Sequence, residues 1–294
     1  LEKAVSLAEN NQANLTVASV IERISAGIGL PDGGPISTEL QAAMASEREQ
    51  KLQSLLEPHR NRVAIETRIL KGTPFLEIIR EVLRNGHDLV IKSPESQEWL
   101  NRIFGSNDMH LLRKCPCPVW IIRTGGAAQT YRSILAAVDV PVGYPAAELK
   151  KRHALSRKIL EIAESLALSE FAELHIVHVW EAIGESTMRG AFARVPERQI
   201  IAYVEQVRRE HAQALNVVIQ EVEEKLGRDV LEYLKPKVHL VKGWARKEIP
   251  LLAKQLNTDL VIMGTVARTG IPGFIMGNTA ETILNQIDCS VLAI

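Results

Sequence analysis

The sequence predicts an α/β protein with two doubly wound parallel sheets of five strands each, derived from an internal duplication. Three observations lead to this expectation. Short apolar runs rich in β-branched residues alternate with amphipathic segments of helical length, as in a parallel sheet covered by helices. The second half of the chain repeats the first. The strand with the clearest boundaries, Leu260–Met263, follows Asp259 and stops at Gly264, where a glycine-rich loop begins.

The repeat is visible as matching segments at a nearly constant spacing. The segment Leu1–Ala8 returns as Leu160–Ala167, 159 positions later. At spacings of 171 or 172, Lys71-Gly72 returns as Lys242-Gly243, Asp88–Ile91 as Asp259–Ile262, and Cys117 as Cys289. Because the spacing changes only inside loops, the pattern indicates a duplicated domain and not a solenoid of short repeats. We expect one domain at residues 1–124 and a second at 131–294, joined by a linker of small residues.

The elements of the first half follow in regular succession. A helix at Leu1–Ala8 has its apolar residues on one face. Pro74 suits the first turn of a helix that ends near Asn85-Gly86. The other predicted elements are a strand at Asn14–Ile21, a charged helix from Thr38 to about Glu57, a strand at Val63–Leu70, a strand at Asp88–Lys92, a helix from Gly105 to about Lys114 and a closing strand at Val119–Ile122.

The second half begins with the strand Ser133–Asp139, which has no counterpart in the first half because Leu1 aligns with Leu160. In a sheet of Rossmann-like or flavodoxin-like order this strand is central, and its neighbours would have unpaired edges without it. We therefore expect the natural protein to begin roughly 25–30 residues before Leu1, the length of that strand and its connection. Further strands are predicted around Val177–Val179 and at Ser290–Ile294.

The loop after Leu260–Met263 has the composition of an anion-binding site. Its four glycines allow backbone N–H groups to approach phosphate oxygens, and Arg268 adds a positive charge. Asn278 and Thr279 are suitable N-caps for a helix that continues to Ile287. The loop has neither the Walker A ending nor the GxGxxG spacing. The alternative is a tight connection between strand and helix that binds no ligand.

These features resemble the universal stress protein family, in particular its tandem E-type branch. ATP-binding members carry glycine, two residues, glycine, nine residues, then Gly-Ser or Gly-Thr. Gly264 and Gly277 match the first and last of these glycines, whereas Ala267 replaces the second and Asn278 replaces the Ser/Thr, with Thr279 one step later. The tandem repeat and the segment Leu111–Trp120 also match, so the resemblance covers nearly the whole chain.

The resemblance implies an ATP site in the second half, with Mg²⁺ as a companion ion of the phosphates. The adenine would contact Ala137, Val138, Asp139 and Val179, and the ribose and phosphates would contact Met263, Gly264, Ala267, Arg268, Gly277, Asn278 and Thr279. Ligands of open α/β sheets bind at the carboxyl ends of strands where the strand order reverses, which agrees with this set.

The first half departs from the family pattern. Ser93 replaces the first glycine, and the acidic Glu95 and Glu98 would repel phosphates. We expect no tight ATP site there. Trp99, Ile103 and Phe104 then either line a cleft for an apolar ligand or are ordinary packing residues.

Other reactive residues have two interpretations each. His175 and His178, three apart on a strand, point to opposite faces, and we expect buried histidines there and not a metal pair. Cys115-Pro-Cys117 suggests either redox chemistry or packing before a strand. No GxSxG or HExxH motif occurs, so we expect no catalytic residues and no metal site.

Composition narrows the function further. Lys+Arg and Asp+Glu balance at 35 each, which argues against nucleic acid and membrane surfaces as partners. Three cysteines indicate a reducing, cytoplasmic setting, and no apolar run approaches the roughly 18 residues of a membrane span.

The predicted function is a stress-response protein in which ATP acts as a switch or stabiliser. The alternatives are a protein that binds another small ligand or a lipid, a scaffold, and a slow ATPase. We expect the two domains to pair as a pseudo-dimer through Val119–Ile122 and Val291–Ile294, which leaves room for a homodimer of the whole chain.

Overall fold

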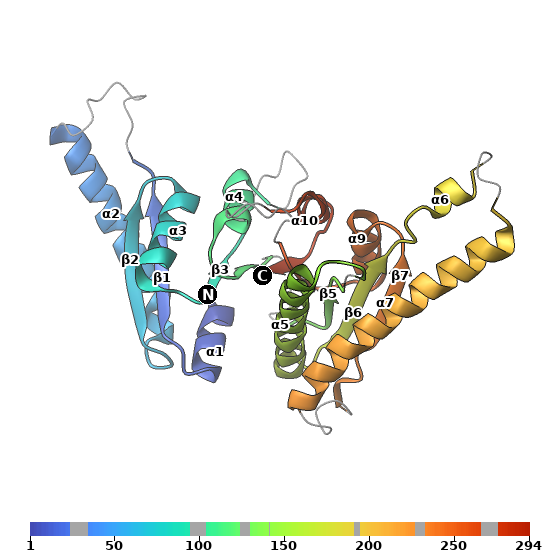
Figure 1. Cartoon of the computed structure of the whole chain (residues 1–294). Coiled ribbons are helices and arrows are strands. Elements are labelled where there is room, and N and C mark those ends of the chain that lie inside the picture. Colours follow the sequence, from blue (N-terminus) through green and yellow to red (C-terminus); the bar gives the residue numbers. More distant parts are fainter. Residues whose placement is uncertain are drawn as a thin grey trace. The chain divides into compact units, whose positions relative to one another are not determined.

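The structure is a computed structural model that describes residues 1–23, 35–94, 104–123, 130–140, 142–190, 195–226, 233–265 and 276–294. The chain forms two compact units (Figure 1). The first comprises residues 1–91 and 106–117, and the second comprises residues 92–105 and 118–294.

The first unit has a two-stranded parallel sheet in which β1 pairs with β2 from Leu15–Ile65 to Ile21–Lys71. Gly86 adopts a left-handed conformation with φ 68° and closes α3, as predicted from its glycine. The elements are α1 (Glu2–Asn10), β1 (Leu15–Ile21), α2 (Pro35–Leu56), η2 (Glu57–His59), β2 (Ile65–Lys71), α3 (Pro74–Asn85) and α4 (Ser106–Lys114).

The second unit is organised around a sheet of order β3-β4-β9-β8-β5-β6-β7. The pairs β9–β8, β8–β5, β5–β6 and β6–β7 are parallel, whereas β4 and β9 are antiparallel. The strands of this sheet are β3 (Val90–Lys92, of which only Lys92 belongs to the second unit), β4 (Val119–Ile121), β5 (Ser133–Ala137), β6 (Glu173–Trp180), β7 (Lys237–Lys242), β8 (Leu260–Met263) and β9 (Ser290–Ala293). Its helices are α5 (Ala146–Glu170), α6 (Glu185–Met188), α7 (Glu197–Leu226), α9 (Ala245–Gln255) and α10 (Asn278–Leu284).

The α/β class is as predicted, but the prediction of two separate five-stranded sheets is wrong. The second half supplies five parallel strands, and β3 and β4 of the first half extend them to a seven-stranded sheet. β1 and β2 form a separate sheet of two strands. In the second half, the neighbours β6 and β8 are joined through β5, and among the described residues no first-half strand takes the equivalent place between β1 and β3.

The core of the second unit is the middle of its sheet. All five residues of β5, all four of β8 and all four of β9 are buried, as expected of parallel strands covered on both faces. α5 packs against α7, and α9 packs against α10. Figure 1 shows the first pair in front of the sheet and the second pair behind it, the arrangement that right-handed crossovers produce.

The last strands of the two halves, β4 and β9, are antiparallel neighbours in the seven-stranded sheet. Val119 pairs with Ala293, Trp120 with Leu292, and Ile121 with Val291. Trp120 and Leu292 are themselves equivalent in the repeat, 172 positions apart like Cys117 and Cys289. The register is therefore symmetric about this central pair, as in an interface between two equivalent strands.

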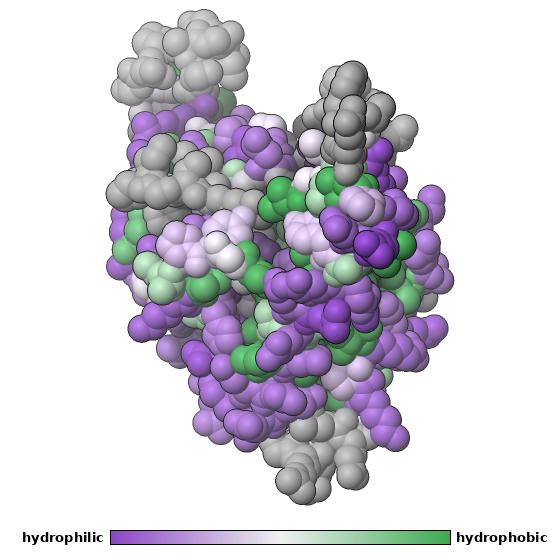
Figure 2. All heavy atoms as spheres, turned by 45° about the vertical axis from the view of Figure 1, so that its right-hand side comes forward, coloured by the Kyte–Doolittle hydropathy of each residue, from purple (hydrophilic) through white to green (hydrophobic). Residues whose placement is uncertain are grey.

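None of the helices that the structure describes combines the length and the hydropathy of a bilayer-crossing segment. On the face shown in Figure 2, hydrophilic side chains surround small, separate groups of hydrophobic ones.

Candidate functional site

The candidate site lies where the strand order of the second unit reverses. β5 is paired with β6 on one side and with β8 on the other, and Ala137 is opposite both Val177 and Met263. From β5 the chain continues through α5 to β6, whereas β8 is followed by α10 and β9. At such a reversal of strand order a ligand-binding crevice is expected outside the carboxyl ends of the strands, here those of β5 and β8.

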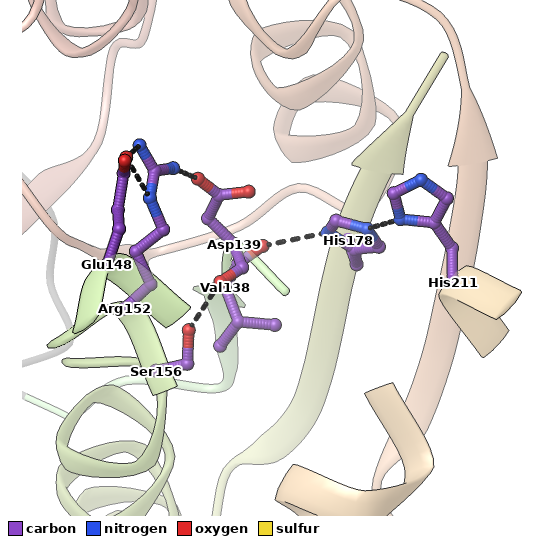
Figure 3. A network of polar contacts seen from close by, with 7 residues as sticks. All are labelled: Val138, Asp139, Glu148, Arg152, Ser156, His178 and His211. Carbon is purple, nitrogen blue, oxygen red and sulfur yellow. Dashed lines mark hydrogen bonds and ion pairs between the residues drawn. The ribbon is translucent and has the colours of Figure 1, made fainter. Parts of the chain in front are cut away.

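Asp139 lies two residues beyond β5 and is held by side chains of α5 (Figure 3). Its carboxylate forms an ion pair with Arg152, and its carbonyl accepts a hydrogen bond of 2.9 Å from the Ser156 hydroxyl. Arg152 also donates to Glu148 through Nε at 3.0 Å and Nη2 at 2.6 Å, and its guanidinium lies 4.9 Å from the Tyr144 ring centre. The Asp139 side chain is still 53% exposed, so a ligand can reach it.

His178 fixes the same connection from the other side. Its Nδ1 lies 3.2 Å from the Val138 carbonyl, which can only accept, so this nitrogen carries the proton. Its Nε2 lies 2.9 Å from His211 Nδ1, a contact that ties β6 to α7. Burial lowers the pKa of His178 to about 4 and also lowers the pKa of His211. His178 is therefore neutral at pH 7, and its contact with the Val138 carbonyl positions the backbone after β5.

The two ends of the glycine loop meet at the carboxyl end of β8. Thr265 donates its N–H to the Ile294 carbonyl at 3.0 Å, and its own carbonyl accepts from the Gly277 N–H at 3.1 Å. Gly264 is in close contact with α5, because a Cβ added to it would lie 2.7 Å from Leu155 Cδ2. Thr265 and Gly277, the residues at which the described chain enters and leaves this loop, are thus held together by a hydrogen bond.

The predicted start of α10 needs correction. Gly277 is the N-cap, and neither Asn278 nor Thr279 is, since the helix begins at Asn278. Gly277 has an extended backbone, φ −67° and ψ 141°, and its carbonyl accepts from the Glu281 N–H at 3.1 Å. The helix ends at Leu284 and does not reach Ile287. The Asn278 and Thr279 side chains are consequently exposed on the first turn and do not cap it.

The structure brings together most of the predicted site residues. Ala137, Val138 and Asp139 follow one another at the end of β5, beside Met263 and Gly264 of β8. Val179 continues the β5–β6 register to the level of Asp139 and is half-buried. Gly277, Asn278 and Thr279 join through the Thr265 hydrogen bond. Ala267 and Arg268 lie outside the described residues.

Sequence reasoning missed the α5 side chains that bind Asp139. Glu148 and Arg152 are four residues apart on one helix, a spacing that predicts an ion pair. Nothing in that spacing shows that the guanidinium also reaches Asp139, so the pair would be interpreted as a solvated surface pair.

Among the other candidate residues, Phe104 and His175 are described by the structure, and both are buried. Trp99, Ile103, Glu95 and Glu98 lie outside the described residues. His175 is buried and its Nδ1 lies 3.0 Å from His239 Nε2 on β7, away from His178, as the strand alternation predicts. In the described part of the chain there is no group of three His, Cys, Asp or Glu side chains suited to a metal ion.

A cavity of about 340 Å³ lies between α5 and α7 and contains none of the predicted site residues. Its lining is mostly apolar and comprises Val140, Leu149, Lys150, His153, Ala214, Val217 and Val218.

Comparison with known sequences identifies relatives over the whole chain. The profile of the Universal stress protein family matches twice, at residues 1–123 and 130–294. Universal stress protein E of Escherichia coli K12 is 34% identical over 239 residues, which cover 79% of this chain and 68% of the relative. The universal stress protein E homolog of Haemophilus influenzae is 29% identical over 309 residues, covering 100% of this chain and 92% of the relative.

Solved structures agree with this similarity. A universal stress protein from Pseudomonas aeruginosa superposes with a TM-score of 0.67 at 25% identity, covering 100% of this chain and 86% of that one. A universal stress protein from Archaeoglobus fulgidus, 18% identical, superposes with a TM-score of 0.62 over 99% of this chain and 91% of its own, and shows the shared fold alone.

Proposed function

The chain belongs to the universal stress protein family, and from that premise we propose that its second half binds an adenine nucleotide, ATP in the first place. The observation that carries the proposal is the pairing of β5 with β8, which places the exposed Asp139 carboxylate near the end of one strand and the joined loop ends Thr265 and Gly277 at the end of the other. The nucleotide acts as a switch or a stabiliser and not as a substrate of rapid turnover.

Each side of the crevice has a role in this proposal. The Asp139 carboxylate accepts the exocyclic N–H of adenine, and the backbone of Ala137 and Val138 with the Val179 side chain bounds the base. The residues proposed to contact the ribose and phosphates are Met263, Gly264, Ala267, Arg268, Gly277, Asn278 and Thr279. Mg²⁺ would be bound by the phosphates and arrive with them.

The Asp139–Arg152 ion pair sets a condition on binding. Arg152 is 14% exposed and already has Glu148 as a second partner, so it can release Asp139 without losing all its charge partners. An incoming adenine therefore competes with a partly satisfied cation for the carboxylate.

The proposed organisation is two universal-stress-protein-like domains, at 1–124 and 131–294, that pair as an internal pseudo-dimer. The two separate profile matches support the division. The symmetric β4–β9 register supports the pairing. We place the protein in a reducing cytoplasmic setting, supported by its three free cysteines.

Titration calorimetry of the full chain with ATP and Mg²⁺ tests the proposal. We expect saturable binding of one nucleotide per chain and its loss in Gly277→Glu, which places a carboxylate beside the phosphates. Gln220→Glu, an exposed position near the C-terminal end of α7, adds the same charge and should bind like wild type. No binding by the wild type, or equal binding by Gly277→Glu, would contradict the site.

A further inference from the structure

Cys115 and Cys117 form a close pair at the end of α4. Their Sγ atoms are 3.6 Å apart, and both side chains are half-buried. The Cys115 N–H donates to the Leu111 carbonyl at 2.9 Å, which fixes Cys115 as the residue that closes the helix. Pro116 and Cys117 follow in a bend, and β4 begins at Val119. The backbone on both sides therefore holds the two sulfurs in contact.

We propose that Cys115 and Cys117 are a redox-active dithiol that a hydroperoxide oxidises to an intramolecular disulfide. The proposal is independent of nucleotide binding, since these residues are not among those of the β5–β8 crevice. It assigns a chemical role to the Cys-Pro-Cys motif, which the proposed nucleotide function leaves without one.

The reaction balances in two steps. The Cys115 thiolate attacks one peroxide oxygen, the O–O bond breaks, and the departing hydroxide takes a proton to form water. The Cys117 sulfur then attacks the resulting sulfenic sulfur, the S–O bond breaks, and a second water leaves as the Cys117 proton is lost. Two thiols supply two electrons, and one hydroperoxide is reduced.

The geometry selects Cys115 as the attacking residue. The Cys117 thiol can donate to the Cys115 sulfur, and this hydrogen bond lowers the pKa of Cys115 to about 7. The same contact, followed by burial, raises the pKa of Cys117, and the negative charge of Asp88 acts in the same direction. At neutral pH the pair thus holds a single proton for a large part of the time, with a thiolate at Cys115.

Disulfide formation requires the two sulfurs to approach from 3.6 Å to about 2.05 Å. A ring that contains only Pro116 between the cysteines is small and strained, and strained disulfides are the ones that thiols reduce readily. Oxidation is therefore reversible in a reducing compartment.

Cys289 provides an internal control. It occupies the position equivalent to Cys117 in the second half, but Ile287 stands where Cys115 would be. It is 7% exposed, and burial raises its pKa to about 12. Cys289 should therefore remain a thiol under conditions that oxidise the pair.

The test is to treat the full-length protein with equimolar hydrogen peroxide at pH 7, unfold it, alkylate it with N-ethylmaleimide and weigh it. We expect one alkyl group in place of three, and a peptide containing Cys115 and Cys117 that has lost two hydrogens. Dithiothreitol should restore all three thiols. Cys289→Ser should lose both of its thiols in the same way, whereas Cys115→Ser should form no intramolecular disulfide.

A second measurement, the rate at which Cys115 reacts with peroxide, tests whether Cys117 activates Cys115 or whether the two thiols react independently. Cys117→Ala removes the hydrogen-bond donor to Cys115, so less of Cys115 is thiolate at pH 7. The remaining thiolate is more nucleophilic because its pKa is higher, so the reaction of Cys115 with peroxide should slow only roughly threefold. Three alkylated cysteines after peroxide, a disulfide to Cys289 or between chains, or an unchanged rate in Cys117→Ala would each overturn the proposal.

Discussion

Arg152 is the side chain that decides how available Asp139 is to a ligand. We expect Arg152→Gln to bind adenosine more tightly than wild type, because the carboxylate no longer has a competing cation. Since Asp139 is half exposed, the ion pair is worth about 0.5–1 kcal/mol, which corresponds to a roughly two- to fivefold gain in affinity. Adenosine is the right probe because it lacks the phosphates, whose attraction to Arg152 would obscure the effect.

Glu148→Gln is the matched control for Arg152→Gln. It removes the second partner of the guanidinium, which then binds Asp139 more fully, so adenosine affinity should fall. Calorimetry of both variants gives opposite signs if Arg152 competes with the base. Changes of the same sign in the two variants would show that Asp139 does not accept the hydrogen bond from adenine.

Glu164 makes the stability of the fold depend on pH. It is fully buried on α5, and neither carboxylate oxygen has a hydrogen-bond partner among the described residues. Burial, with Glu223 and Glu161, raises its pKa to about 7 from an ordinary 4.5. The folded chain therefore holds a proton that the unfolded chain releases above pH 4.5, and stability is lost as the pH rises through 7.

Replacing Glu164 with glutamine should remove this loss. We subtract the free energy of unfolding of wild type from that of Glu164→Gln at each pH, both measured by urea titration. This difference should increase by about 3 kcal/mol between pH 4.5 and about pH 8. Glu161→Gln, on the exposed side of the same helix, should show no comparable gain. A constant difference between Glu164→Gln and wild type across this range would mean that Glu164 is ionised when folded.

At the scale of the elements, the two halves build one turn in the same way. Gly72 and Gly243, equivalent in the repeat, have φ of 145° and 148°. Each glycine follows one strand and donates its N–H to the last carbonyl of the strand paired with it. Gly72 donates to Ile21 of β1 and Gly243 to Trp180 of β6, both at 2.9 Å. A Cβ on either glycine would meet the side chain of a glutamate, Glu77 or Glu248, at 2.8 or 2.7 Å.

This turn should tolerate no side chain in either half. We expect Gly72→Ala and Gly243→Ala each to lower the free energy of unfolding by about 2–3 kcal/mol, from backbone strain and the clash together. Gly86→Ala is the control: its φ is 68° but the added Cβ meets nothing within 4 Å, so the cost should be about 1 kcal/mol. Chemical denaturation compares the three, and equal costs would contradict the role of the clash.

Local patterns predicted the elements well. The strand Asn14–Ile21 is β1 (Leu15–Ile21), and the helix that starts at Pro74 ends at Asn85, because these boundaries depend on nearby proline, glycine and apolar periodicity. α10 was placed less well, since Asn278 is a good N-cap residue but the hydrogen bond from Gly277 to Thr265 moves the cap one residue earlier.

At the scale of the whole molecule, the sequence showed the duplication but not how the strands are shared between sheets. A seven-stranded sheet depends on β4 pairing with β9, two strands about 170 residues apart, and no local pattern specifies such a partner. For the candidate site, too, some features depend on the order of the strands and others on packing between distant segments. The strand-end residues were predictable from the topology, whereas the attachment of Arg152 to Asp139 depends on how α5 packs.

The most direct test of the nucleotide site is photolabelling of the full chain with 8-azido-ATP, followed by peptide mapping. The azide is on the base, so we expect the label in peptides that contain residues 137–139 or Val179, reduced by excess ATP and lost in Gly277→Glu. Label that ATP displaces from residues 1–123 instead, or no label that ATP displaces, would contradict nucleotide binding between β5 and β8.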